Sequence, residues 1–327
     1  MDLPHIDNCE EFPYGVRTYI SAGRFATVWQ CTRQKEVVAC KLFANSYDAL
    51  PDCAKYFGEL RRNEVNIMGK LRGQRHIVHI IETICIRRDF FIIMTPLAEF
   101  DLQKLLSLIR DGTKERDDYR ESLLKAFGCL SSALDYIHEQ KIRHKDIKPQ
   151  NILYSKSSCY FADFGISQEF EDHSNLLITR SERPQYTDRY CPPETLKPTV
   201  YSSIPTFSLL PRYPWLAMEE SFARDARSDV FSLGCTFYEI LAILEPEIFP
   251  TQNESYRECI TKIKDSLKAA VSREPSLTSL LEFCSKMLSQ DRIKRPHPLL
   301  TELKSMHSSD LFEKYFCHDC RLDISKL

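Results

Sequence analysis

The segment that most constrains this chain reads IRHKDIKPQNIL, residues 142–153. It places Asp146, Lys148 and Asn151 on one loop that leads into a short apolar strand. A second short segment, CYFADFG, follows and brings Asp163 next to another strand. Two acids, an amide and a lysine between short strands mark this region as the candidate functional site.

The character of the sequence changes near residues 95–100. Before that point, short β-branched and aromatic runs between turn residues indicate strands, with one helix expected in KYFGELRRNEVNIMGKLRG. Beyond Asp101, amphipathic or strongly apolar runs such as ESLLKAFGCLSSALDYIHEQ and SDVFSLGCTFYEILAIL indicate helices. We therefore expect an α+β chain with a small β-rich lobe, a larger helical lobe and a cleft between them.

Composition excludes several classes of protein. The 44 Lys and Arg residues nearly balance the 46 Asp and Glu residues, which gives no argument for binding nucleic acid or an anionic membrane. Apolar runs such as FFIIM are too short to span a bilayer. The 13 scattered cysteines indicate reduced thiols, and MDLPHIDNCEEF does not resemble a signal peptide. We expect an intracellular protein, cytoplasmic and/or nuclear, without a membrane span.

The ordered segments resemble the signature of the eukaryotic protein kinase superfamily, serine/threonine type. Besides the segments above, VACK with Lys41, the glycine-poor loop ISAGRFATVW and YTDRYCPPE with Thr187 carry this resemblance. It covers roughly residues 17–307 and implies the two-lobed protein kinase fold. The implied parts are an N-terminal extension at 1–16, an N-lobe at 17–95, a C-lobe at 96–307 with an insert at about 195–226, and a tail at 308–327.

The resemblance implies transfer of the γ-phosphate of ATP to a protein Ser or Thr hydroxyl. In this reaction the protein holds the phosphates and the metal and neutralises developing charge. Asp146 would orient the acceptor hydroxyl, and Lys148 would point at the moving phosphoryl group. Asn151 and Asp163 would bind Mg²⁺ through hard oxygen ligands.

The resemblance also assigns the nucleotide site. Lys41 would reach the α- and β-phosphates if a carboxylate holds it; Glu64 is the best candidate and Glu59 the alternative. Met94 corresponds to the gatekeeper, and residues 95–97 to the hinge that binds adenine. The residues expected to contact ATP are Ile20, Ser21, Gly23, Val28, Ala39, Lys41, Met94, Thr95, Leu97, Asp101 and Leu153.

Two further features follow from the resemblance. Glu194 is expected to pair with Arg295 in DRIKRP, as a positioning device more than a stabiliser. An apolar spine is expected to link the lobes and to be anchored by an acid. Its members are Met68, Ile80, Phe164 and His144, with Asp229 as the anchor.

The phosphate loop departs from the family pattern, because Ser21 and Ala26 occupy two of its three glycine positions. The backbone amides of such a loop bind phosphate, so these side chains matter only if they hinder the backbone. A required positive φ would cost about 1–2 kcal/mol at each position. We expect a weakened but active enzyme, and a nucleotide-binding pseudokinase that acts through protein interactions is the alternative.

Control by loop phosphorylation is expected to be modest. Lys145 precedes Asp146 where the family usually carries Arg, and lysine lacks the planar fork that binds phosphate bidentately. Thr179 and Ser181 are the candidate acceptors in the loop that follows Gly165. Changing both to alanine is therefore expected to have little effect on activity.

Other functions compete with protein phosphorylation. A small-molecule kinase shares the cleft, but Thr187, Pro193 and Glu194 favour a protein acceptor. The insert at 195–226 is either a surface excursion with its own aromatic packing or a protein docking surface, as in a pure interaction module.

The segment CHDC offers Cys317, His318 and Cys320 as metal ligands, but a zinc site needs four and no second pair stands nearby. We expect these cysteines to be reduced surface thiols. Three histidines in apolar surroundings are expected to be structural: His76, His79 and His138.

Overall fold

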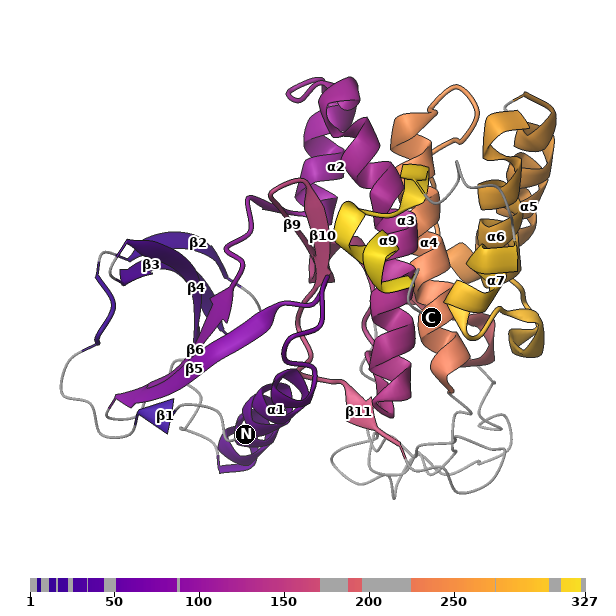
Figure 1. The fold of residues 1–327 in the computed structure, drawn as a ribbon. Coiled ribbons are helices and arrows are strands. Elements are labelled where there is room, and N and C mark those ends of the chain that lie inside the picture. Colours follow the sequence, from indigo (N-terminus) through magenta and orange to yellow (C-terminus); the bar gives the residue numbers. More distant parts are fainter. Residues whose placement is uncertain are drawn as a thin grey trace, which may run out of the picture.

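The computed structural model describes residues 5–6, 12–15, 17–22, 26–33, 35–43, 51–86, 89–170, 188–195, 225–273, 275–305 and 313–324. Figure 1 shows a sheet-based lobe joined through a short connection to a larger helical lobe. The expectation of an α+β chain with two lobes is confirmed.

The first lobe is built on one six-stranded sheet with the order β1-β5-β6-β4-β3-β2. Neighbouring strands are antiparallel except β1, which runs parallel to β5. Helix α1 (Pro51–Lys70) accompanies the sheet (Figure 1). The strands are β1 (His5–Ile6), β2 (Thr18–Ala22), β3 (Thr27–Arg33), β4 (Glu36–Phe43), β5 (His79–Ile86) and β6 (Asp89–Thr95).

The segment expected to be an N-terminal extension contributes to this sheet. Strand β1 adds the outer parallel partner of β5, and the Gly15 amide donates to the Thr32 carbonyl at 2.7 Å. The buried Tyr14 hydroxyl also donates to Glu82 on β5. The described residues 5–6 and 12–15 of this segment thus include residues that pair or bond with strands of the lobe.

The second lobe is mainly helical. Its helices are α2 (Leu102–Arg110), α3 (Arg116–Glu139), α4 (Ala226–Leu244), α5 (Tyr256–Arg273), α6 (Thr278–Met287), α7 (Leu299–Ser305) and α9 (His318–Ile324). Short strands β7 (Phe100–Asp101), β9 (Ile152–Ser155) and β10 (Ser158–Phe161) form a sheet, and β8 (Ile142–Arg143) pairs with β11 (Gln168–Glu169). Among the described helices, none has the length and apolar character needed to cross a bilayer.

The apolar pattern of the sequence explains how these helices pack. Helix α2 buries one stripe, Leu102, Leu105, Leu106 and Ile109, and α4 is buried along almost its whole length. One apolar core runs through both lobes and includes Met68, Ile80 and Phe164. The His144 ring is fully buried and lies 4.8 Å from the Phe164 ring, measured between centroids. Three of the residues expected to form a spine are therefore part of this core, and the buried His144 packs against one of them.

A buried ion pair fixes the segment before the insert. Both guanidinium nitrogens of Arg295 lie 2.7 Å from the carboxylate oxygens of Glu194, so the predicted pair is confirmed and is bidentate. Arg295 is 2% exposed and also donates to the Ser289 and Arg227 carbonyls. The pair holds the short 3₁₀ turn Pro193–Thr195 against the start of α4.

Glu194→Gln is expected to lower the free energy of unfolding by about 3 kcal/mol, because it leaves the Arg295 charge buried without its carboxylate. The measurement is urea denaturation of the wild type and the variant. Glu302→Gln is the control, since its partner Lys286 is 53% exposed and such pairs contribute at most about 1 kcal/mol. Equal losses in the two variants would contradict the positional role of Arg295.

Candidate active site

The loop from 144 to 151 is held from below by one buried carboxylate. Asp229, near the start of α4, accepts hydrogen bonds from the backbone amides of His144 at 2.8 Å and Lys145 at 2.9 Å. It also accepts one from the His138 ring at 3.1 Å. Burial opposes the charge of Asp229, but these hydrogen bonds outweigh it and lower the pKa of the carboxyl. The ionised acid thus fixes a backbone that has a positive φ at Lys145.

The loop brings three predicted residues together. Asp146 accepts hydrogen bonds on its Oδ2 atom from Lys148 Nζ at 2.7 Å and from Asn151 Nδ2 at 2.8 Å. Asn151 also donates to the Asp146 carbonyl at 2.9 Å. Because its amide nitrogen is used in this way, the amide oxygen of Asn151 is the atom that can bind a cation.

A second charged cluster joins the two lobes. Lys41 on β4 lies 2.6 and 2.8 Å from the two carboxylate oxygens of Glu64 on α1, and 3.1 Å from Asp163 Oδ1. Glu64 is 2% exposed, whereas the alternative Glu59 is exposed. The structure therefore selects Glu64 as the partner of Lys41.

The charges of Lys41 and Asp163 stabilise each other, whereas burial raises the pKa of Glu64. Burial opposes the charge of Lys41, but attraction to Asp163 and Glu64 outweighs it and raises the pKa of the ammonium. The Lys41 charge in turn lowers the pKa of Asp163. The side chain of Asp163 is 52% exposed, so an ionised carboxylate faces solvent beside the lysine.

Asn63 is a site residue that the sequence analysis missed. It precedes Glu64 on α1, and its amide donates to the backbone carbonyls of Gly165 at 3.0 Å and Ser167 at 2.8 Å. It thus ties α1 to the segment that follows Asp163. Its position directly before the lysine partner was the only signal in the sequence.

The expected adenine contacts come from neighbouring strands. Val28 on β3 lies opposite Lys41, and Ala39 on β4 lies opposite Met94 on β6. Leu153 on β9 lies opposite Asp101 on β7. All four apolar residues belong to the main core or pack against it.

The hinge residues lie between β6 and β7. Thr95 ends β6, and the Leu97 carbonyl accepts a hydrogen bond from Ser155 Oγ at 2.9 Å. Asp101, expected to face a ribose, caps helix α2 through its Oδ1 atom, which accepts from the Lys104 amide at 2.8 Å. One carboxylate oxygen of Asp101 is therefore already used to cap helix α2.

The structure describes the start of the phosphate loop. Ile20 and Ser21 lie on β2 and are exposed, and Ser21 pairs with Val28. Ser21 is not among the described residues with a positive φ. The penalty considered for Ser21 is therefore absent. Gly23 lies outside the described residues.

A small hollow lies beside Asp146. It is lined by residues that include Lys145, Asp146, Tyr190, Cys191 and Pro192. Thr179, Ser181, Thr187 and residues 196–224 of the insert lie outside the described residues, so the expectations for them stay predictions.

Comparisons with known proteins agree with this geometry. The family model for the protein kinase domain matches residues 14–209. The chain is 29% identical over 232 residues to serine/threonine-protein kinase fused of Drosophila melanogaster, which covers 70% of this chain and 24% of that protein. It is 28% identical over 245 residues to serine/threonine-protein kinase 36 of Pongo abelii, covering 73% of this chain and 15% of the relative.

A third relative is shorter. MAP kinase-activated protein kinase 2 of Mus musculus is 32% identical over 207 residues, which cover 60% of this chain and 44% of that protein. The chain thus spans less than half the length of each of these three relatives. The matched domain covers more than half of this chain, which therefore belongs to the eukaryotic protein kinase superfamily, serine/threonine type.

Proposed function

We propose that this chain is an ATP- and Mg²⁺-dependent protein kinase that phosphorylates Ser or Thr hydroxyls in proteins. The observation that carries the proposal is the Lys41–Glu64 ion pair with Asp163 alongside, at 2.6 and 3.1 Å from the lysine nitrogen. Protein kinases need this pair and the metal-binding acid in place together.

The nucleotide would lie between the lobes. Val28, Ala39 and Leu153 would contact the adenine ring, and the backbone of Thr95 and Leu97 would bind its polar edge. The other proposed contacts are Ile20, Ser21, Gly23, Met94 and Asp101. Lys41 would bind the α- and β-phosphates, with Glu64 fixing its position.

The residues present fit a divalent cation. Asn151 offers an amide oxygen, and Asp163 offers an ionised, half-exposed carboxylate; both are hard oxygen donors. When bound, Mg²⁺ would neutralise phosphate charge at this position. Asn151 and Asp163 would hold it. Asn151 directly precedes β9 and Asp163 follows β10, so both lie at the open end of this hairpin, where Ile152 pairs with Phe161.

The side chains of Asp146 and Lys148 would bind and activate the acceptor hydroxyl of the substrate. Asp146 would accept the hydrogen bond of the substrate hydroxyl and take up its proton as the phosphoryl group transfers. Lys148, 2.7 Å from Asp146, would place a positive charge beside the moving phosphoryl group. The hollow next to Asp146 gives an acceptor segment access to this carboxylate.

The first test is transfer of labelled γ-phosphate from ATP to a generic Ser/Thr protein, with Mg²⁺ or with EDTA. Asp146→Asn is expected to lower the rate by about 10²–10⁴, because it removes the group that orients and deprotonates the hydroxyl. Asp118→Asn, at an exposed position in the first turn of α3, is the matched control and should leave the rate unchanged.

The same experiment separates an enzyme from a pseudokinase. ATP that raises the melting temperature without any Mg²⁺-dependent label on Ser or Thr would sink the proposed activity and leave a nucleotide-binding scaffold. Label on tyrosine alone would contradict the proposed acceptor class.

The phosphate loop gives a second prediction. Restoring glycine in Ser21→Gly is expected to change the KM for ATP by less than about threefold, because Ser21 lacks the positive φ that would make glycine favourable. Steady-state kinetics at saturating acceptor would measure it. A tenfold or larger fall in KM, worth about 1.4 kcal/mol, would show that the Ser21 side chain does hinder phosphate binding.

A further inference from the structure

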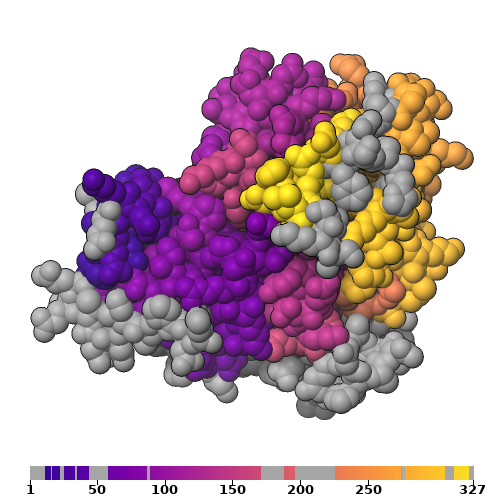
Figure 2. Space-filling model, in the orientation of Figure 1, coloured from indigo at the N-terminus to yellow at the C-terminus, as the bar shows by residue number. Residues whose placement is uncertain are grey.

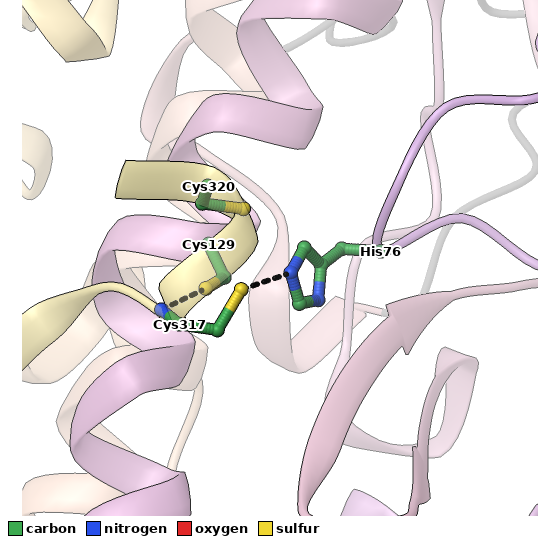
Figure 3. Close-up of side chains that lie close together, drawn as sticks. All are labelled: His76, Cys129, Cys317 and Cys320. Carbon is green, nitrogen blue, oxygen red and sulfur yellow. Dashed lines mark hydrogen bonds between the residues drawn. The ribbon is translucent and has the colours of Figure 1, made fainter. Parts of the chain in front are cut away.

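Four ligand-type side chains from three distant parts of the chain meet on one side of the molecule. His76 precedes β5, Cys129 lies on α3, and Cys317 and Cys320 lie at the start of α9 (Figure 3). Their ligand atoms all lie within 4.8 Å of one another. Three are buried, and Cys317 is partly buried.

This cluster corrects the expectation for the CHDC segment. Cys320 is 4% exposed, so the two cysteines of the segment are not both surface thiols. His318 is exposed and lies outside the cluster. Instead, His76 and Cys129 supply the two ligands that were missing from the neighbouring sequence. His76, expected to be an ordinary structural histidine, is one of the four.

The distances suit a small tetrahedral metal ion. Zinc bonds of about 2.3 Å to sulfur and about 2.0 Å to nitrogen place ligand atoms roughly 3.5–3.8 Å apart. His76 Nε2 lies 3.3 Å from Cys317 Sγ, and the widest separation in the cluster is within 4.8 Å. Side-chain adjustments of an ångström or less would bring all four atoms to bonding distance.

The histidine is oriented as a metal ligand would be. His76 Nδ1 lies 2.9 Å from the Cys159 carbonyl, so this nitrogen carries the proton and donates it. The lone pair is then on Nε2, which faces the three sulfur atoms (Figure 3). Zinc-bound histidines almost always donate their second ring N–H to a carbonyl or carboxylate in this way.

The backbone around the cluster is shaped to bring the segments together. A Cβ atom on Gly128 would lie 2.3 Å from the Tyr315 carbonyl oxygen and 2.6 Å from Phe316 Cζ, so only glycine allows residues 315–316 to rest on α3. The next residue of the tail, Cys317, then lies over Cys129. Its amide donates to Cys129 Sγ at 3.2 Å.

A disulfide explains the cluster less well than a metal does. Any one disulfide would use only two of the three sulfur atoms and would leave the third sulfur and the His76 ring outside the bond. Three thiolates and one imidazole use all four groups, and this soft donor set selects zinc over magnesium or calcium.

We propose that His76, Cys129, Cys317 and Cys320 bind a structural zinc ion that fastens α9 to α3 and to the segment after α1. Four protein ligands leave no open position for water or substrate, which is the arrangement of structural sites. In Figure 2 the yellow C-terminal segment lies where the violet first lobe meets the magenta and pink parts of the second. The ion would thus join three segments at the junction of the lobes.

The test is the metal content of the full chain, purified under reducing conditions without chelators and analysed by mass spectrometry of the elements. The wild type is expected to carry about one zinc per chain. Cys320→Ser and His76→Ala are expected to lose it. His318→Ala, from the same CHDC segment, is the matched control and should retain it, as should Cys85→Ser.

Two further measurements use only the wild-type protein, so they do not depend on whether a variant folds. Zinc binding contributes to folding, so a strong chelator should lower the melting temperature of the wild type. Cobalt added to the stripped wild type should give the absorption bands of a tetrahedral thiolate site. These readouts do not depend on phosphoryl transfer, so they can fail or succeed independently of the proposed kinase activity.

Three outcomes would overturn the proposal. One is wild-type protein with far less than stoichiometric zinc and no cobalt spectrum. Another is a Cys129–Cys317 or Cys317–Cys320 disulfide found in the protein as purified. The third is loss of zinc in His318→Ala together with retention in His76→Ala.

Discussion

The charge on Lys41 is the constraint on which the active-site geometry depends. An ammonium that is 16% exposed is tolerable only where carboxylates lie at contact distance, and both of its partners come from other elements. Glu64 requires α1 to lie close to β4, and Asp163 requires the second lobe to approach the first. The contacts of Lys41 therefore fix the positions of the sheet, helix α1 and Asp163 relative to one another.

Other buried charges also hold segments from different elements in fixed positions. Asp229 holds the backbone of the loop from 144 to 151, and Arg295 holds Glu194 beside the start of α4. Pairs of this kind gain little net stability, because removing the groups from water costs about as much as their attraction returns. The apolar core through both lobes supplies the stability, and the buried charges select one arrangement of the loops that carry chemistry.

The resemblance of local motifs to the kinase signature was enough to predict which of these residues the structure brings together. Asp146, Lys148 and Asn151 lie within six residues, and a short strand pair fixes Asp163 near them, so short segments carried this information. Two features depended on backbone geometry or long-range packing and escaped prediction. The φ angle of Ser21 cannot be read from residue identity, and the parallel pairing of β1 with β5 joins segments nearly eighty residues apart.

The cysteine cluster shows the same limit most clearly. The prediction for CHDC depended on metal ligands nearby in sequence, but Cys129 and His76, the partners of Cys317, lie 188 and 241 residues away from it. Two contacts place these partners. Gly128 packs against residues 315–316, and the backbone of His76 is held by a hydrogen bond in which its carbonyl accepts from the Phe161 amide at 2.8 Å. The His76 backbone also has a positive φ of 61°. A non-glycine residue held in that conformation and bonded on both its backbone and its ring is fixed by its surroundings, which is what a metal ligand requires.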